Sequence, residues 1–482
     1  MVLLMIGSLL TGAGGTYAAM TWKEEVPTST QTPTETEAVS NVTPEENPNV
    51  KAENMDKVAQ AFQLIKGSYV EDVKEKQLVE GAIQGMLTTL DDPYSVYMDE
   101  ETAKQFSDML DSSFEGIGAE VSMVDGKTII VAPFKDSPAE KAGIKPNDQI
   151  LSVDGVGVDG LDLYETTLKI RGKKGTMVVL EIMRQGLKEP ITIKVKRDEI
   201  PQITVYSKIK KQDGKSIGYM EITSFSEETA EEFKKQLKGL ENKKIEGLVL
   251  DVRGNPGGFL ESVQDILKEF VSKEKPYVQI EKRNGEREKY YTTLEKDKPY
   301  PVAVLIDKGS ASASEILAGA LQEAERITLI GEKTFGKGTV QQAVPMGDGS
   351  NIKLTLFKWL TPDGNWIHKK GIEPDIAVKQ SDLFYVHPLQ LKEPLEKDMN
   401  NEQVKNAQQI LASLGYEPGR TDGYFSSDTE TTVKAFQREN SLKVDGRIDN
   451  QTAAALEQDV LQELKKDKND LQLQTALKIM AK

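Results

Sequence analysis

The sequence contains no cysteine and only two histidines, His368 and His387, among its 482 residues. These absences exclude thiol nucleophiles, disulfides, thiolate metal sites and most ordinary zinc ligand sets. Chemistry must therefore depend on hydroxyl, amine, carboxyl or amide groups, and we expect neither a metal nor an organic cofactor. The lack of cysteine fits a reducing cytosol or a Gram-positive cell exterior equally well, because a chain of this length needs no disulfides for stability.

Positive charge is also scarce. The 61 Lys and Arg face 77 Asp and Glu, which gives a formal net charge of -16. That balance opposes general affinity for phosphates, so we expect no nucleic-acid partner. The length exceeds what one hydrophobic core usually organises, and it predicts between two and four domains.

Charge is absent altogether from the first residues, Met1 to Thr21, which begin with the apolar run MVLLMIGSLL and end in small residues. This pattern predicts an export segment over residues 1–22, either cleaved or kept as a short membrane anchor, and we favour the anchor. A buried core helix is the alternative, and the positive n-region of a typical signal is missing. Residues 23–51 are polar and rich in Pro and Thr, which predicts a flexible linker.

Residues 52–112 have helical periodicity. Met55, Val58, Phe62 and Ile65 recur at helix spacing, and a second helix is predicted around residues 78–90. Two apolar helices at this place indicate either a helical hairpin packed in a core or self-association, so we expect part of the region to pack on the core and consider a homodimer through these helices.

Residues 113–198 alternate short β-type runs with Gly and Asp turns, with one helix near residues 161–170. The stretches EGIGAEV, DSPAEKAGI and NDQILSVDG follow in order from residues 115, 136 and 147. In this order they closely resemble a PDZ domain. PDZ domains bind an extended chain as an added strand and receive its terminal carboxylate in a loop of backbone N–H groups.

The resemblance implies that Gly116, Ile117 and Gly118 form the carboxylate-binding loop, where the residues alone also allow an ordinary β-turn. Arg171, directly after the predicted helix, could pair with a core carboxylate or with the substrate terminus. An ordinary solvated surface arginine is the alternative.

Residues 199–395 alternate strands and helices, which predicts an α/β core. Residues 398–460 contain a short echo, Asp422-Gly423 with Thr429 and Asp445-Gly446 with Thr452. This segment is similar to a three-helix peptidoglycan-binding domain and predicts peptidoglycan as a partner or a merely structural module. Residues 461–482 are predicted as a charged helical tail with a solvated face.

Three serines, Ser310, Ser312 and Ser314, lie between a predicted strand that ends near Ile306 and the helix that follows it. A helix N-terminus directs backbone N–H groups outward and favours negative charge, so it could stabilise an oxyanion. Ser312 with Glu315 also spells a capping box, which would explain both residues structurally.

A serine nucleophile needs a base, and neither histidine has a recognisable triad context, so lysine is the leading candidate. Lys337 lies between Gly336 and Gly338 in a stretch of Phe, Gly, Thr and Val. The glycines would allow tight packing, and burial beside side chains such as Phe335 would lower the pKa of the lysine. A surface hairpin lysine is the alternative for this stretch taken alone.

Together, SASASE (310–315), FGKGTVQ (335–341) and the upstream turn GNPGG (254–258) closely resemble the carboxyl-terminal processing proteases. The match extends from about residue 71 to 375 and includes LDDPYS (90–95), TPDG (361–364) and GIEPD (371–375). The resemblance is to the Gram-positive type, with a PDZ domain and a peptidoglycan-binding domain.

The resemblance implies a multidomain α/β protein. It would combine a crotonase/Clp-like α/β protease core, an inserted mostly-β PDZ domain and a C-terminal all-α module. Ser312 would be the nucleophile, Lys337 the general base and Gln341 the residue that orients the lysine. The N–H groups of Gly258 and Ala313 would form the oxyanion hole, although Gly257 is a second candidate. Substrates would be proteins with a free C-terminus on the outer, cell-wall side of the membrane.

Two other functions remain as alternatives. The chain could be a scaffold in which a PDZ domain and a wall-binding module flank an inactive core, but the intact Ser, Lys and Gln positions disfavour this. It could also hydrolyse peptidoglycan, although the sequence offers no zinc ligands and no convincing pair of glycosidase carboxylates.

Overall fold

The computed structural model describes residues 52–482, apart from residues 111–112, 125, 135, 162, 185–186 and 188. The anchor and linker expected over residues 1–51 lie outside this range. A search of the described helices found none with the length and apolar character needed to cross a membrane.

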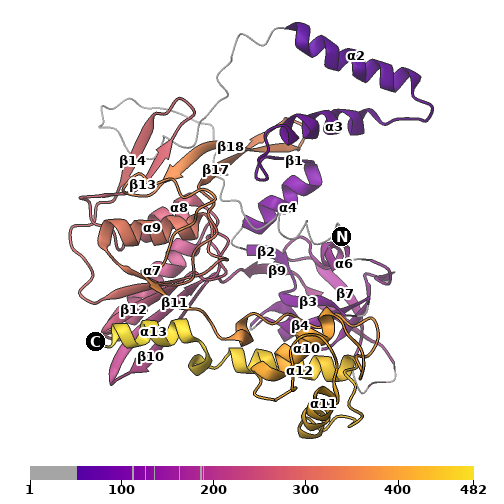
Figure 1. Cartoon of the computed structure of the whole chain (residues 1–482). Helices are drawn as coiled ribbons and strands as arrows, with labels where there is room; N and C mark the ends of the chain where they lie inside the picture. Colours follow the sequence, from indigo (N-terminus) through magenta and orange to yellow (C-terminus); the bar gives the residue numbers. More distant parts are fainter. Residues whose placement is uncertain are drawn as a thin grey trace.

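The two N-terminal helices lie at one end of the molecule, away from the core sheet (Figure 1). They are α2 (Ala52–Ser68) and α3 (Glu75–Thr88), close to the predicted bounds. None of the residues of α3 is buried, and Leu64 of α2 is 67% exposed. A hairpin buried in a core is therefore wrong for the chain as a monomer, because α2 and much of α3 keep apolar side chains such as Leu64, Val79 and Met86 exposed to solvent. The rest of the region does pack on the core, through β1 (Val96–Met98) and α4 (Glu100–Leu110).

The inserted domain is mostly β, as predicted. Strands β2 (Ser113–Gly116) and β9 (Asp198–Pro201) pair with each other and form its two ends. Between them lies a sheet of order β3-β4-β5-β7-β8, to which β6 adds through β5. Its strands are β3 (Ala119–Val124), β4 (Lys127–Pro133), β5 (Gln149–Val153), β6 (Val156–Gly157), β7 (Met177–Met183) and β8 (Ile191–Lys196). Two helices, α5 (Pro138–Lys141) and α6 (Leu163–Ile170), complete the domain.

The α/β core is built on a sheet of order β10-β11-β12-β15-β16-β19, parallel except for the β10–β11 pair. Its strands are β10 (Val205–Gln212), β11 (Lys215–Ile222), β12 (Gly247–Asp251), β15 (Val302–Ile306), β16 (Thr328–Gly331) and β19 (Ile376–Ala377). Helices α7 (Thr229–Asn242), α8 (Leu260–Leu267) and α9 (Ala313–Glu325) bury one face. Alternate side chains point to opposite faces of a strand, so Leu248 and Leu250 join this cluster, whereas Val249 belongs to the other face.

The other face of the core sheet is covered by α13 (Leu471–Met480), the last helix of the chain. Leu473, Ala476, Leu477 and Met480 are all at most 4% exposed there. The solvated face predicted for the tail is therefore wrong for this helix. The charges of the tail lie mostly in residues 465–470, before this helix, and burial against the sheet stabilises a helix that would be too short to be stable alone.

The C-terminal module is held between two neighbouring attachment points on the core. Gln380, before the module, donates to Asp470, after it, at 2.6 Å, and the Leu471 N–H donates back to Gln380 at 3.0 Å. Short 3₁₀ turns, Asp382–Phe384 and Asp467–Asn469, flank the module's helices. The module is thus an insertion whose entry and exit are hydrogen-bonded to each other.

Inside the module, the repeated Asp-Gly and Thr pattern corresponds to a repeated hydrogen-bond arrangement. Its helices are α10 (Glu402–Ser413), α11 (Ser427–Glu439) and α12 (Asn450–Leu464). Buried Gln408 accepts from the Gly423 N–H and donates to Thr429. Buried Gln437 makes the same pair of bonds with Gly446 and Thr452. Each glutamine thus satisfies a turn and a helix start, which explains the spacing.

A second, antiparallel sheet lies next to the core and carries residues that surround Lys337. Its order is β1-β18-β13-β14, with β17 paired to β18. The strands not yet given are β13 (Pro276–Glu281), β14 (Arg287–Tyr291), β17 (Thr339–Pro345) and β18 (Asn351–Leu360). Because β1 pairs with β18, the N-terminal segment becomes part of this sheet.

The fold class predicted from the sequence, an α/β core with an inserted mostly-β PDZ domain and a C-terminal helical module, is confirmed.

Candidate active site

Two turns that follow neighbouring parallel strands form the base of the site. β12 and β15 are paired, so their carboxyl ends, and the turns 253–258 and 307–312 after them, meet at one edge of the sheet. Asn255 joins the turns: its backbone oxygen accepts from the Ala311 N–H at 3.0 Å and from Ser314 Oγ at 2.9 Å. Its side chain donates to Ile222 and accepts from the Gly257 N–H. The two turns are therefore fixed relative to each other by a residue that is itself fully buried.

The three serines have different surroundings. Ser310 is fully buried and donates through Oγ to the Val252 carbonyl at 2.8 Å. Ser314 is fully buried and donates to the Asn255 carbonyl. Both hydroxyls thus hold turns together. Ser312 is 8% exposed and precedes α9, so it retains access to solvent where the helix begins.

Ser312 has an unusual backbone, with φ 53° and ψ -113°. A residue other than glycine held with positive φ is strained, and such strain concentrates at functional sites. The turn that contains Gly257 packs directly against it. A Cβ on Gly257 would lie 2.9 Å from Ser312 Cβ and 3.0 Å from the Ala313 nitrogen. Only glycine fits there, which brings the 254–258 turn to the serine.

Glu315, fully buried on the first turn of α9, connects the serine to the lysine. Its Oε2 accepts from the Ser312 N–H at 2.9 Å and from the Lys337 N–H at 2.8 Å. Its Oε1 accepts from the Gly336 N–H and from Thr334 Oγ1, at 2.7 and 2.6 Å. Burial raises the pKa of Glu315, while these four hydrogen bonds oppose the rise. The capping-box reading is therefore correct in part, but this carboxylate also binds the backbones of both predicted catalytic residues.

Lys337 is 1% exposed. Its pKa is lowered from 10.5 to about 7, mainly by burial and also by the nearby Lys353, while Glu315 and Asp92 act in the opposite direction. A fraction of the amine is therefore neutral near pH 7, as a base requires. The surface-hairpin alternative is wrong for this lysine.

The glycines on either side of Lys337 allow close packing, as predicted. A Cβ on Gly336 would lie 2.9 Å from the Gly371 nitrogen, and one on Gly338 would lie 2.7 Å from the His368 nitrogen. The expectation that Phe335 helps to bury the lysine is wrong, because Phe335 is 57% exposed. Trp359 is buried beside the lysine instead, and its Nε1 donates to the Lys337 carbonyl at 2.8 Å.

Gln341 lies on strand β17 at a β-bulge, not in a helical turn. Its Nε2 donates to Thr339 Oγ1 at 3.0 Å and to Thr355 Oγ1 at 2.9 Å. Its Oε1 is buried and has no hydrogen-bond partner. A buried acceptor without a donor is costly, and this oxygen can still accept a hydrogen bond.

The residues predicted for peptide binding form a separate group in the inserted domain. Gly116 ends β2, and Ile117 and Gly118 form the short connection to β3. Gly118 has a φ of 73°, and a Cβ there would lie 2.6 Å from Ser137, so the loop requires glycine. Arg171 lies beside this loop, with its guanidinium 4.7 Å from the centre of the Phe114 ring.

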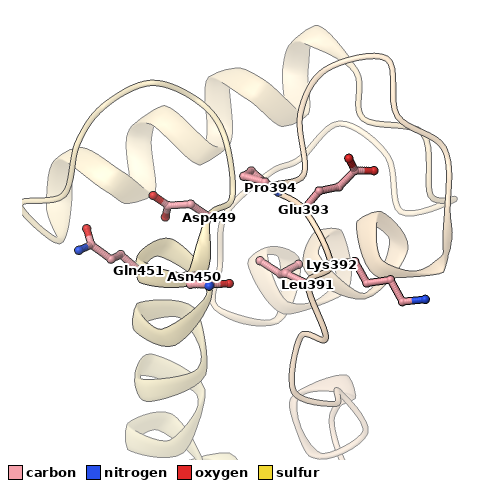
Figure 2. Close-up of a pocket in the computed structure, with 7 residues that line it drawn as sticks. All are labelled: Leu391, Lys392, Glu393, Pro394, Asp449, Asn450 and Gln451. Carbon is pink, nitrogen blue, oxygen red and sulfur yellow. The ribbon is translucent and has the colours of Figure 1, made fainter. Parts of the chain in front are cut away.

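A pocket of about 430 Å³ lies far along the chain from the serine, in the C-terminal module (Figure 2). It is lined by residues of the segment that enters the module and by the start of α12: Leu391, Lys392, Glu393, Pro394, Asp449, Asn450 and Gln451. Its position separates it from the residues that surround Lys337.

Sequence reasoning assigned no role to Asn255, to Lys353 or to Tyr94, whose ring centre lies 4.9 Å from Lys337 Nζ, and it recognised Glu315 only as a cap. Tyr94 belongs to the LDDPYS stretch, which carries the family resemblance without an assigned role. Lys353 is buried on the mostly apolar strand β18, whereas Lys358 on the same strand is exposed, and a lysine at an inward-facing strand position is the signal that could have indicated it.

Comparison with family models matches four parts of the chain. Residues 216–378 match peptidase family S41, and residues 116–195 match a PDZ domain. Residues 9–102 match the N-terminal domain of the activating protease CtpB, and residues 400–456 match a putative peptidoglycan-binding domain.

Among curated proteins, the carboxy-terminal processing protease CtpB of Bacillus subtilis is 58% identical over 99% of this chain and 98% of its own length. CtpA of the same organism is 43% identical over 89% of this chain and 90% of its own. Among solved structures, the photosystem II D1 C-terminal processing protease is 27% identical, with a TM-score of 0.41, and covers 67% of this chain and 92% of its own.

Proposed function

We propose that this chain, which belongs to the carboxy-terminal processing proteases, the serine peptidases of family S41, cleaves extracytoplasmic proteins near their C-termini through Ser312, Lys337 and Gln341. The observation that carries the proposal is the buried Glu315 carboxylate, whose Oε2 accepts from the N–H groups of both Ser312 and Lys337. The same carboxylate thus holds the backbones of a serine and of a lysine whose pKa is about 7, and this arrangement suits acyl transfer.

In the proposed reaction, neutral Lys337 takes the proton of Ser312 Oγ while this oxygen attacks the substrate carbonyl. The resulting lysine ammonium then protonates the leaving amine as the peptide bond breaks. Water, deprotonated by Lys337, hydrolyses the acyl-enzyme and restores the serine. No step needs a metal ion or an organic cofactor.

The developing oxyanion would accept hydrogen bonds from the Ala313 and Gly258 N–H groups. Ala313 begins α9, where the helix dipole favours negative charge. The Gly257 N–H already donates to Asn255 Oδ1 at 2.8 Å, which favours Gly258 over Gly257 as the second donor.

Gln341 would orient the lysine by accepting a hydrogen bond from Nζ through Oε1. Two threonines already hold the amide nitrogen, so the oxygen has a fixed direction. Its lack of a partner supports a role that is completed when the site takes its active geometry.

We further propose that the PDZ domain captures the free carboxylate of the substrate at Gly116, Ile117 and Gly118. Arg171, which lies beside this loop, would couple the binding of a peptide in the PDZ domain to the active site in the core. The domain interrupts the protease sequence, which supports coupling of peptide binding to cleavage. The proposed division of the chain is residues 113–198 for this domain, 199–395 for the core and 398–460 for the wall-binding module.

The similarity of the module to peptidoglycan-binding domains supports a location on the cell-wall side. Its pocket is a candidate place for a wall fragment (Figure 2). The exposed apolar side chains of α2 and α3 support a homodimer through these helices, because contiguous apolar surface is costly in water.

The test compares the full chain with Ser312→Ala and Lys337→Ala on an unfolded protein that has a free apolar C-terminus. Cleavage by the unchanged chain and its loss in both variants would support the proposal. Full activity of either variant would refute the mechanism. Release of muropeptides from purified cell wall, without proteolysis, would instead favour a wall hydrolase, and absence of both activities would favour a scaffold.

A further inference from the structure

An aromatic residue from the N-terminal segment lies on the lysine of the site. The Lys337 Nζ is 4.9 Å from the centre of the Tyr94 ring. Tyr94 is half-buried, whereas Lys337 is almost completely buried, so the ring separates the amine from solvent. This residue comes from a turn shortly after α3, outside the residues that matched the peptidase model.

The ring is held in place by other aromatic groups. The Tyr94 ring meets His368 edge-on at 6.3 Å, and His368 stacks on Trp366 at 5.2 Å. Trp366 Nε1 donates to the Gly338 carbonyl at 2.8 Å. These contacts run from Lys337 through Tyr94, His368 and Trp366 back to Gly338, the residue after the lysine. They therefore fix the tyrosine relative to the backbone that carries Lys337.

The turn that carries Tyr94 is fixed as well. Asp92 accepts from the Tyr94 N–H at 3.0 Å and from Ser95 Oγ at 2.6 Å. Ser95, which is 5% exposed, accepts in turn from the Thr355 N–H at 3.0 Å. Thr355 Oγ1 is also an acceptor for Gln341, so one threonine joins the turn to the proposed orienting residue.

We propose that Tyr94 is a positioning residue of the peptidase reaction, whose ring closes the outer side of the Lys337 pocket and excludes water from the amine. The inference rests on the proposed role of Lys337 as the base. It adds that the base is completed by the N-terminal segment, so the α/β core alone would contain the lysine without its dry surroundings.

Two effects of the ring on the lysine oppose each other. Exclusion of water disfavours the ammonium and can lower the pKa of a buried lysine by up to about 3–5. Attraction of the ammonium to the ring face raises the pKa by about 1. Removal of the ring should therefore raise the pKa of Lys337. The charged groups that act on this amine are Lys353, Glu315 and Asp92, and the substitution replaces none of them.

The experiment measures kcat/KM against pH for the full chain and its variants, with an unfolded protein substrate that has a free apolar C-terminus. In Tyr94→Ala we expect the midpoint of the pH profile to rise by about 1 from its value near 7. This rise would lower kcat/KM about fivefold at pH 7 and leave it nearly unchanged above about pH 9. Tyr94→Phe, which keeps the ring, should retain the original midpoint. Tyr97→Ala, three residues along on β1, is the matched control and should also retain it.

Ser95→Ala serves as a second, smaller change if Tyr94→Ala does not fold. It loosens the turn without altering charge, and we expect a smaller shift in the same direction. An unchanged or lowered midpoint in Tyr94→Ala, or in Ser95→Ala when that variant must stand in for it, would overturn the inference. Failure of the proposed function has a different signature: the unchanged chain would lack the ionisation near pH 7, and Lys337→Ala would keep its activity.

Discussion

The serine side and the lysine side of the site are built differently. The serine side consists of two turns after neighbouring strands of one sheet, joined by Asn255 and packed through Gly257. The lysine side draws on strands of the second sheet and on a turn from the N-terminal segment. Gln341 there still has a buried oxygen without a partner.

This difference indicates where control can act. The serine side depends mainly on the core sheet and on α9, so its geometry should change less. The lysine side depends on segments more than 200 positions apart in sequence, such as Ser95 and Thr355. A displacement of any of these segments would move residues that contact Lys337 or Gln341. We infer that the lysine side is the side whose assembly can be controlled.

Ser312→Ala should have the largest effect, because it removes the proposed nucleophile. We expect peptidase activity to fall by at least about 10⁴-fold, while the free energy of unfolding stays within about 1 kcal/mol. Peptide release and chemical denaturation measure the two quantities. Ser314→Ala is the comparison: it should lose stability by about 1 kcal/mol through its hydrogen bond to Asn255 but retain most activity. The reverse pattern would reassign the nucleophile.

Glu315→Gln attacks the residue that joins the two sides. The glutamine amide has one oxygen in place of two, so some of the four donors that bind the Glu315 carboxylate lose their acceptor. We expect a loss of about 3 kcal/mol in the free energy of unfolding and of at least about 100-fold in kcat. Glu373→Gln, an exposed partner of Lys333, is the control and should change neither. Normal kcat in Glu315→Gln would separate this carboxylate from the site.

Gln341→Ala should affect the lysine side alone. Loss of the orienting acceptor should reduce kcat by about 10- to 100-fold. The free energy of unfolding should fall by about 1–2 kcal/mol, because the bonds to Thr339 and Thr355 are lost, although removal of the partnerless oxygen offsets part of that loss. Gln342→Ala, the next residue on β17, serves as the control for truncation of this strand. Equal effects of the two substitutions on kcat would remove Gln341 from the mechanism.

Asp470→Asn should have the smallest effect on catalysis. Asp470 binds Arg253, at the start of the 253–258 turn, at 2.8 Å, and attaches α13 to the core. We expect a loss of about 1–3 kcal/mol in unfolding free energy and less than about a threefold change in kcat/KM. Asp467→Asn, whose more exposed carboxylate pairs with Lys210, should cost less than about 1 kcal/mol. A large loss of activity in Asp470→Asn would show that the serine side also depends on the last helix.

The sequence predicted the fold class and the main elements because these depend on periodicity and local motifs. Examples are the strand before SASASE, the glycines around Lys337 and the PDZ-like loop. It could not predict that Tyr94 reaches Lys337 or that α13 covers the core sheet. Those contacts depend on tertiary packing between distant segments, which no local pattern encodes. Phe335 illustrates the same limit, since an apolar neighbour in sequence points to solvent.

The most direct test of the central claim follows the rate at which an acylating, active-site-directed reagent modifies Ser312, measured from pH 5 to 10 by mass spectrometry. Burial lowers the pKa of Lys337 to about 7, and a base must be neutral. The modification rate should therefore rise with pH through one ionisation near 7 and then level off. Lys337→Ala should abolish this dependence and most of the rate. A modification rate that does not depend on pH across this range, or that is unchanged in Lys337→Ala, would contradict the account.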